Sequence, residues 1–64
     1  MVKINGNHYD LDGKTLEEYL ESSAYDRKRV AVERNGAIIS KAEYCVTVLK
    51  DGDEIEIVSF VGGG

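Results

Sequence analysis

Two Asn-Gly dipeptides, Asn5-Gly6 and Asn35-Gly36, limit how this chain can fold. Both central residues of a type I′ turn need positive φ, so Asn-Gly beside alternating apolar residues is the strongest short signal for a β-hairpin. Val2 and Ile4 alternate with polar residues directly before the first dipeptide. The sequence therefore predicts a half-buried strand over residues 1–5 that ends in a tight turn.

The segments beside the dipeptides supply further strands. Residues 8–11 should return antiparallel to the first strand, with Tyr9 and Leu11 facing inward. Residues 30–34 alternate between apolar and polar side chains and meet the second dipeptide, and the short apolar segment 37–39 follows it. We therefore expect a hairpin near the start of the chain and, later, a strand that ends at a second turn.

One helix is predicted between these two regions. Thr15 and Glu18 have the spacing of a capping box, in which each side chain binds the free backbone N–H of the other residue. The helix should end at Ser22-Ser23. Positions i, i+3 and i+4 form one apolar stripe that can pack on a sheet: Leu16, Tyr19 and Leu20.

The second half of the chain carries shorter signals. Ser40 and Glu43 repeat the capping-box spacing and predict a single helical or 3₁₀ turn. Residues 45–49 are a candidate short strand, residues 50–54 a polar turn, and residues 55–61 the last strand. This order predicts an α+β fold in which one main helix packs on one face of a small mixed sheet.

Length and composition restrict the class of protein. The chain has 64 residues, which is enough for one small domain, over residues 1–61, followed by a glycine tail at 62–64. The formal charge of −4 opposes binding to nucleic acid, and no apolar run is long enough to cross a membrane. A single cysteine and the lack of a secretion signal fit the reducing cytoplasm.

The run Gly62-Gly63-Gly64 is the strongest functional signal. Glycine has no Cβ, so Gly62 and Gly63 can enter a narrow enzyme channel that would exclude any side chain. The carboxylate of Gly64 is then the candidate reactive group. The alternative is an ordinary frayed terminus.

The last strand offers a docking surface just before this tail. If Ile55 and Ile57 face the core, Val58 and Phe60 fall on the face of the sheet that the helix leaves uncovered. Exposed apolar residues rimmed by charge commonly mark interaction sites. The alternative is a bulge, or local burial of both faces of the strand, that puts Phe60 in the core.

Other reactive residue types do not form a site of their own. His8 has no nucleophile or paired carboxylate nearby in the sequence, and one His with one Cys supplies too few ligands for zinc. We expect Cys45 to be a small buried hydrophobic residue, with a nucleophile or persulfide acceptor as the alternative. The cluster Arg27-Lys28-Arg29 reads as a surface loop, or else as a phosphate or partner contact.

Taken together, the hairpin, the single helix, the acidic turn and strand over residues 49–57 and the terminal Gly63-Gly64 resemble the ThiS family of bacterial sulfur carriers. The resemblance covers essentially the whole chain and is most specific over residues 50–64. It implies a ubiquitin-like β-grasp fold. It also implies that the chain is not an enzyme but a substrate of partner enzymes, and that it binds no cofactor stably.

In the cycle that the resemblance implies, an E1-like adenylyltransferase uses ATP to adenylate the Gly64 carboxylate. A sulfur donor system, such as a cysteine desulfurase, then supplies sulfur for a thiocarboxylate. Thiazole synthase takes this sulfur for the thiazole part of thiamine. A molybdopterin-type sulfur carrier, a ubiquitin-like protein modifier and a small interaction module with an idle tail remain as alternatives.

Overall fold

The structure is a computed structural model that describes residues 1–60. Along the chain the elements are β1 (Val2–Ile4), β2 (Asn7–Tyr9), α1 (Leu16–Ser22), η1 (Arg27–Arg29), β3 (Val30–Arg34), β4 (Ala37–Ile39), η2 (Lys41–Glu43) and β5 (Glu54–Ser59), where η marks a 3₁₀ helix. Within these residues no helix is long and apolar enough to span a bilayer.

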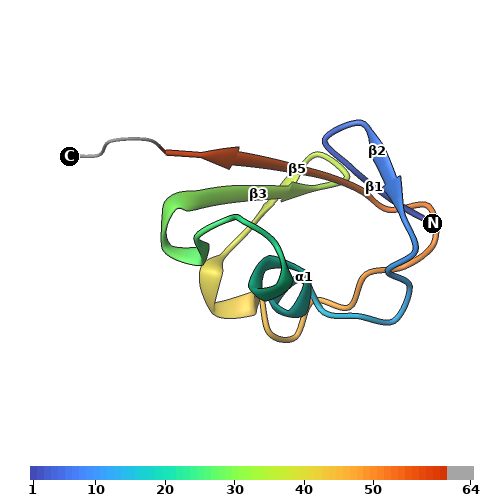
Figure 1. The fold of residues 1–64 in the computed structure, drawn as a ribbon, viewed down its shortest axis with the longest axis horizontal. Helices are drawn as coiled ribbons and strands as arrows, with labels where there is room; N and C mark the ends of the chain where they lie inside the picture. Colours follow the sequence, from blue (N-terminus) through green and yellow to red (C-terminus); the bar gives the residue numbers. More distant parts are fainter. Residues whose placement is uncertain (61–64) are drawn as a thin grey trace.

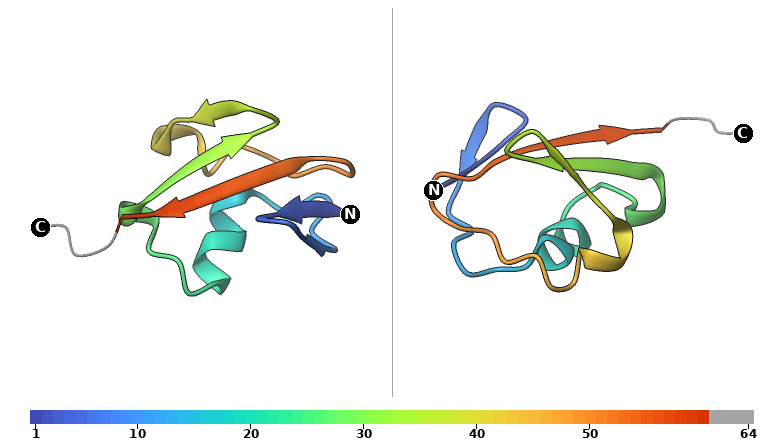
Figure 2. Two further views of the ribbon diagram at one scale, coloured as in Figure 1. Left: turned by 90° about the horizontal axis from the view of Figure 1, so that it is seen from above. Right: turned by 180° about the vertical axis from the view of Figure 1, so that it is seen from behind.

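The strands form one five-stranded sheet in the order β2-β1-β5-β3-β4. The central strand β5 runs parallel to β1, and the other neighbours pair antiparallel. Figure 1 and the right-hand view of Figure 2 show α1 and the segment after β4 on the same side of this sheet. The predicted α+β class is confirmed, and the arrangement is that of a ubiquitin-like β-grasp fold.

Both Asn-Gly dipeptides form the tight turns that the sequence predicts. Asn5 and Gly6 have φ of 48° and 87°, and Asn35 and Gly36 have φ of 51° and 88°. These are the left-handed conformations that a type I′ turn requires. The first turn joins β1 to β2, and the second joins β3 to β4.

The core lies between the sheet and α1. The capping box is present, since Glu18 N donates to Thr15 Oγ1 at 3.1 Å and Thr15 N donates to Glu18 Oε1 at 2.9 Å. The predicted stripe supplies two fully buried leucines, and Tyr19 is half-buried. The buried apolar side chains are Val2, Ile4, Leu16, Leu20, Val30, Val32, Tyr44, Leu49, Ile55 and Ile57.

The return strand of the first hairpin is shorter than predicted. It covers Asn7–Tyr9. Tyr9 faces the side of α1 as predicted, since it pairs with the buried Val2, but it stays 38% exposed. Strand β2 is an edge strand, so Tyr9 has neighbours on one side only; its ring lies 5.9 Å from that of Tyr19. Leu11 is partly buried against the core.

The prediction of a strand over residues 45–49 is wrong. This segment runs beside the loop that precedes α1, where Leu16 N donates to Thr47 O and Leu49 N to Lys14 O, both at 2.8 Å. Only one isolated bridge, between Thr15 and Val48, has β geometry there. These backbone groups are paired with a loop and a helix start, and local sequence patterns do not reveal such partners.

The same segment corrects the prediction for Cys45, which is exposed and not buried. Tyr44 occupies the core position instead, at 1% exposure. Residues 44–46 form a turn, which directs the next side chain away from the core.

The sequence predicted one of the two 3₁₀ helices, η2, but not the other, η1. The turn after Ser40 forms as expected, although the Ser40 hydroxyl donates to Glu43 Oε1 at 3.2 Å and does not cap the backbone. The charged connection is more regular than expected. Lys28 N donates to Asp26 Oδ1 at 2.9 Å, which caps a 3₁₀ turn over Arg27–Arg29.

Candidate functional site

The candidate site is the end of β5 together with the face of the sheet opposite α1. Figure 1 shows β5 lying between β1 and β3. The predicted tail residues Gly62, Gly63 and Gly64 lie outside the described residues, as does Val61. What the structure describes is therefore the surface from which the tail continues.

Both predicted docking residues lie on this surface. Val58 is 56% exposed and Phe60 59% exposed, so the alternative that placed Phe60 in the core is wrong. Val58 lies opposite Ala31 of β3. Phe60 N donates to Arg29 O at 2.7 Å, which fixes the backbone up to the last described residue. Their role in docking remains a prediction.

Strand β5 is held from the β1 side by a side chain. Asn5 Oδ1 accepts from Ile57 N at 2.8 Å, and Asn5 Nδ2 donates to Ile57 O at 3.1 Å. Strand β1 ends at Ile4, so the Asn5 amide takes over the pairing where the backbone of β1 turns away. Sequence reasoning found Asn5 as a turn residue but missed this second task.

Asn35 holds the start of β5 from the opposite side. Glu54 N donates to Asn35 Oδ1 at 2.9 Å, and Asn35 N donates to Glu54 O at 2.8 Å. The two turn asparagines thus bind the strand that leads to the tail, one from each neighbouring hairpin. The repetition of the Asn-Gly dipeptide was the available sequence signal, but nothing local shows which strand the side chains reach.

The turn before β5 contains a buried carboxylate, Asp53, at 5% exposure. Its oxygens accept from Lys50 N at 2.9 Å and Asn35 Nδ2 at 3.2 Å, and Oδ2 lies 3.0 Å from Arg34 Nη2. Burial alone would raise the pKa of Asp53, but these donors outweigh it, so the pKa is lowered. The network locks the polar turn predicted over residues 50–54 against the second hairpin.

The basic cluster divides into a structural residue and two exposed ones. Arg27 Nε donates to Glu17 Oε1 at 2.7 Å, and its guanidinium carbon lies 5.4 Å from the ring centroid of Tyr44. Arg27 therefore ties α1 to the segment after β4. Lys28 and Arg29 are exposed, as a surface connection requires.

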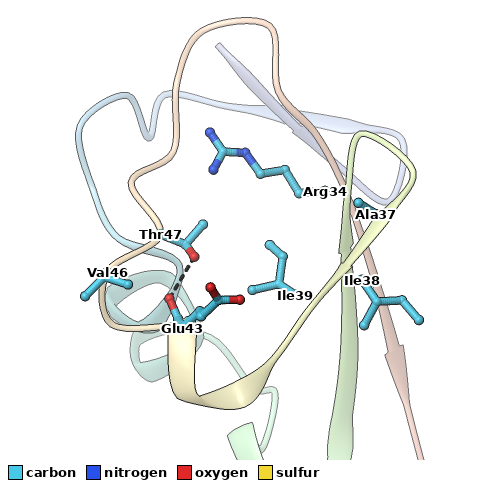
Figure 3. A pocket seen from close by; sticks show the side chains of 7 residues that line it. All are labelled: Arg34, Ala37, Ile38, Ile39, Glu43, Val46 and Thr47. Atoms are coloured by element: carbon cyan, nitrogen blue, oxygen red, sulfur yellow. Dashed lines mark hydrogen bonds between the residues drawn. The ribbon is translucent and has the colours of Figure 1, made fainter.

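A surface hollow of about 330 Å³ lies between β4 and residues 43–47. Figure 3 shows Ile39 pointing toward this hollow and Ile38 pointing to the other side of β4. Its polar groups already have partners, since Arg34 binds Asp53 and Thr47 Oγ1 donates to Glu43 O at 2.7 Å. The described lining residues include no histidine or cysteine: Arg34, Ala37, Ile38, Ile39, Glu43, Val46 and Thr47.

The remaining candidates for chemistry stay isolated. His8 is exposed on the edge strand β2. Within residues 1–60, no group of three or more His, Cys, Asp or Glu residues is placed to hold a metal ion. The described part of the chain thus presents an exposed apolar pair, Val58 and Phe60, at the end of a strand that hydrogen bonds hold from both sides.

Comparison with known proteins gives consistent matches over the whole chain. The sulfur carrier protein ThiS of Bacillus subtilis is 44% identical over 66 residues, and that of Thermus thermophilus is 41% identical over 64 residues, with both chains fully covered in each case. A crystal structure of the thiamine biosynthesis protein ThiS from Geobacter metallireducens superposes with a TM-score of 0.78 at 30% identity, covering 98% of this chain and 97% of that one.

A longer relative also matches. The thiazole synthase of Magnetococcus marinus is 41% identical over 64 residues, which is 98% of this chain but 20% of that protein. This chain therefore spans about a fifth of the length of that relative. The model of the ThiS family matches residues 2–64, and the chain belongs to the ThiS family.

Proposed function

We propose that this chain is a sulfur carrier for the synthesis of the thiazole part of thiamine, with the carboxylate of Gly64 as its working group. The observation that carries the proposal is the full-length similarity to two proteins named sulfur carrier protein ThiS. The geometry of β5 supports it, because hydrogen bonds hold this strand up to Phe60, four residues before Gly64.

A carboxylate needs activation before sulfur can replace one of its oxygens. Its charge is delocalised over two oxygens, so it is a poor electrophile. An E1-like adenylyltransferase uses ATP to convert the Gly64 carboxylate into an acyl adenylate, with AMP as the leaving group and pyrophosphate released. The persulfide of a donor such as a cysteine desulfurase attacks the acyl carbon and displaces AMP, which gives an acyl disulfide. A thiol then cleaves the S–S bond, so that the thiocarboxylate leaves and the thiol is oxidised to a disulfide. Thiazole synthase is the proposed acceptor.

The length of the tail sets where partners must touch the domain. A fully extended chain covers at most about 3.3 Å per residue, so Gly64 reaches no more than about 13 Å beyond Phe60. An enzyme whose reactive centre holds Gly64 must therefore bring the mouth of its channel close to Phe60 and Val58. Gly62 and Gly63 form the thin part that such a channel admits.

In this proposal catalysis belongs to the partners. The chain is their substrate, holds no cofactor stably and works in the cytoplasm, where the adenylyltransferase uses ATP. The compact domain serves as a handle that two different enzymes recognise, and the exposed pair Val58 and Phe60 supplies the apolar part of that handle.

Mass spectrometry tests the proposal directly. The chain is incubated with the adenylyltransferase, ATP, cysteine and a cysteine desulfurase. We expect the mass to increase by one oxygen-to-sulfur exchange, and fragmentation should place this change at Gly64. A variant that lacks Gly64 is the matched control. An unchanged mass, under conditions that convert the Bacillus subtilis carrier, overturns the proposal.

The acceptor needs a second step in the same experiment. Addition of thiazole synthase and its other substrates should return the carrier to its carboxylate form and yield the thiazole product. Discharge only by a molybdopterin synthase would assign the other sulfur-carrier pathway. Isopeptide conjugates to lysine side chains would assign a protein modifier.

A further inference from the structure

The outer face of the sheet carries a pair of glutamates that lie directly opposite each other. Glu33 of β3 and Glu56 of β5 are register partners, and both are exposed. The neighbouring register pair, Val32 of β3 and Ile57 of β5, is buried in the core. Since side chains alternate along a strand, both glutamates point away from α1.

This pairing lowers the stability of the unbound domain. Directly opposed residues of an antiparallel pair have Cβ atoms roughly 4.5–5.5 Å apart, and like charges there destabilise the sheet. Among residues 1–60, the ion pairs formed by basic groups involve neither Glu33 nor Glu56. Glu54, two residues before Glu56 on the same strand, adds a third carboxylate to this face, and Lys3 of β1, the register partner of Glu54, adds one cation. Lys3 and Glu56 line the same surface hollow, so this face carries three carboxylates against one lysine. A cation from another molecule would relieve the repulsion.

Apolar side chains flank the two carboxylates. Ile38 of β4 lies opposite Glu33 and is 77% exposed, and Val58 follows Glu56 by two positions on the same face. We call Ile38, Glu33, Glu56 and Val58 the acidic sheet patch. A protein surface that presents one lysine or arginine within an apolar surround is complementary to it in charge and in polarity.

The position of the patch identifies which partner covers it. The patch includes Val58, so it is continuous with the surface beside the tail. An enzyme that holds Gly64 within about 13 Å of Phe60 must cover this part of the sheet as well. Thiazole synthase is favoured because the matching relative from Magnetococcus marinus carries that name and contains a region similar to this chain.

We propose that Glu33 and Glu56 together bind a lysine or arginine side chain of thiazole synthase, and so select this enzyme by charge. The inference rests on the proposed function. Two carboxylates side by side suit the planar guanidinium of arginine, which donates to both, and also accept an ammonium group placed between them. Charged groups at the rim of an interface act mainly on the association rate and on salt dependence.

Two substitutions with a matched control test the pair. Glu33→Gln and Glu56→Gln, alone and together, remove charge at constant size. Glu21→Gln makes the same change in net charge as either single variant, and it lies on α1, which covers the opposite face. Thiazole synthase is immobilised on a sensor surface, and the affinity and association rate of the carrier are measured as it binds. The measurement is made at low salt and at about 0.5 M salt, where the Debye length is only a few Å.

We expect the double variant to bind thiazole synthase about tenfold more weakly at low salt, mainly through slower association, and to approach the wild-type affinity at high salt. Its melting temperature should rise by about 1–4 °C, since the cross-strand repulsion is gone. Glu21→Gln should leave the affinity nearly unchanged. If Glu33 and Glu56 had only a structural role, removing their charges would not raise the melting temperature and at the same time weaken binding.

Three results overturn the inference. These are a double variant that binds like the wild type, an equal loss in Glu21→Gln, and a loss of binding to the adenylyltransferase with none to thiazole synthase. All three leave the proposed function standing, as long as the wild-type chain forms the thiocarboxylate and discharges it to thiazole synthase. A chain that never forms the thiocarboxylate overturns the proposed function.

Discussion

Replacing Asn5 with glycine tests whether a turn side chain holds the strand that leads to the tail. Glycine accepts the φ of 48° at this position, so Asn5→Gly keeps the turn and removes only the amide. The amide makes two bonds to the backbone of Ile57, at 2.8 and 3.1 Å. A third bond, from Asn5 Nδ2 to the Tyr25 hydroxyl at 3.0 Å, is exposed.

The magnitude follows from these contacts. A neutral hydrogen bond contributes about 0.5–1.5 kcal/mol net, so the two bonds to Ile57 amount to about 1–3 kcal/mol. We assign little to the exposed bond, because water replaces it. A core of this size rarely supplies more than about 3–5 kcal/mol, so Asn5→Gly should remove a large share of the unfolding free energy.

Two measurements check the result. Urea unfolding followed by circular dichroism gives the change in unfolding free energy, and amide hydrogen exchange reports the protection of Ile57 N–H. Asn5→Asp is the matched control, because it keeps an oxygen for Ile57 N but loses the donor to Ile57 O; it should be intermediate. An unfolding free energy within about 0.5 kcal/mol of the wild type, with unchanged exchange at Ile57, would refute the reasoning.

Three further changes test other parts of the structure. Thr15→Ala removes the capping box and should lower the unfolding free energy by about 1 kcal/mol, measured by thermal melting. Asp53→Asn should destabilise the protein at pH 7. Because the pKa of Asp53 is lowered in the fold, the difference from wild type should be full above about pH 4 and vanish as pH falls through the folded pKa; urea titrations between about pH 7 and pH 2 measure it. Phe60→Ala should change the unfolding free energy by less than about 0.5 kcal/mol yet weaken binding to thiazole synthase by more than about 1 kcal/mol, as calorimetry can show.

Local rules predicted the parts of this fold whose causes are local. Positive φ at Asn5 and Asn35 follows from the Asn-Gly dipeptide, and the helix start follows from the reciprocal bonds of Thr15 and Glu18. Alternation in β5 placed Val58 on the outer face. In each case the residues that decide the conformation are separated by four positions or fewer along the chain.

The errors arose where partners are distant in sequence. Residues 45–49 look like a strand, but their backbone groups pair with the loop before α1, about thirty positions earlier. The exposure of Cys45 depends on Tyr44 filling the core instead. The bonds from Asn5 to Ile57 span 52 positions. No periodicity contains this information, because it depends on which strands become neighbours.

The two Asn-Gly dipeptides therefore matter for the candidate site as much as for the turns. Their side chains bind β5 at Glu54 and at Ile57, on either side of Glu56. This placement fixes the strand that carries Glu56 and Val58 relative to β1 and β3. Under the proposed function, a tail that reaches only about 13 Å can serve two enzymes only if the face behind it is presented in one orientation. We therefore expect the residues that close the hairpins also to set the geometry from which Gly64 is offered to its proposed partners.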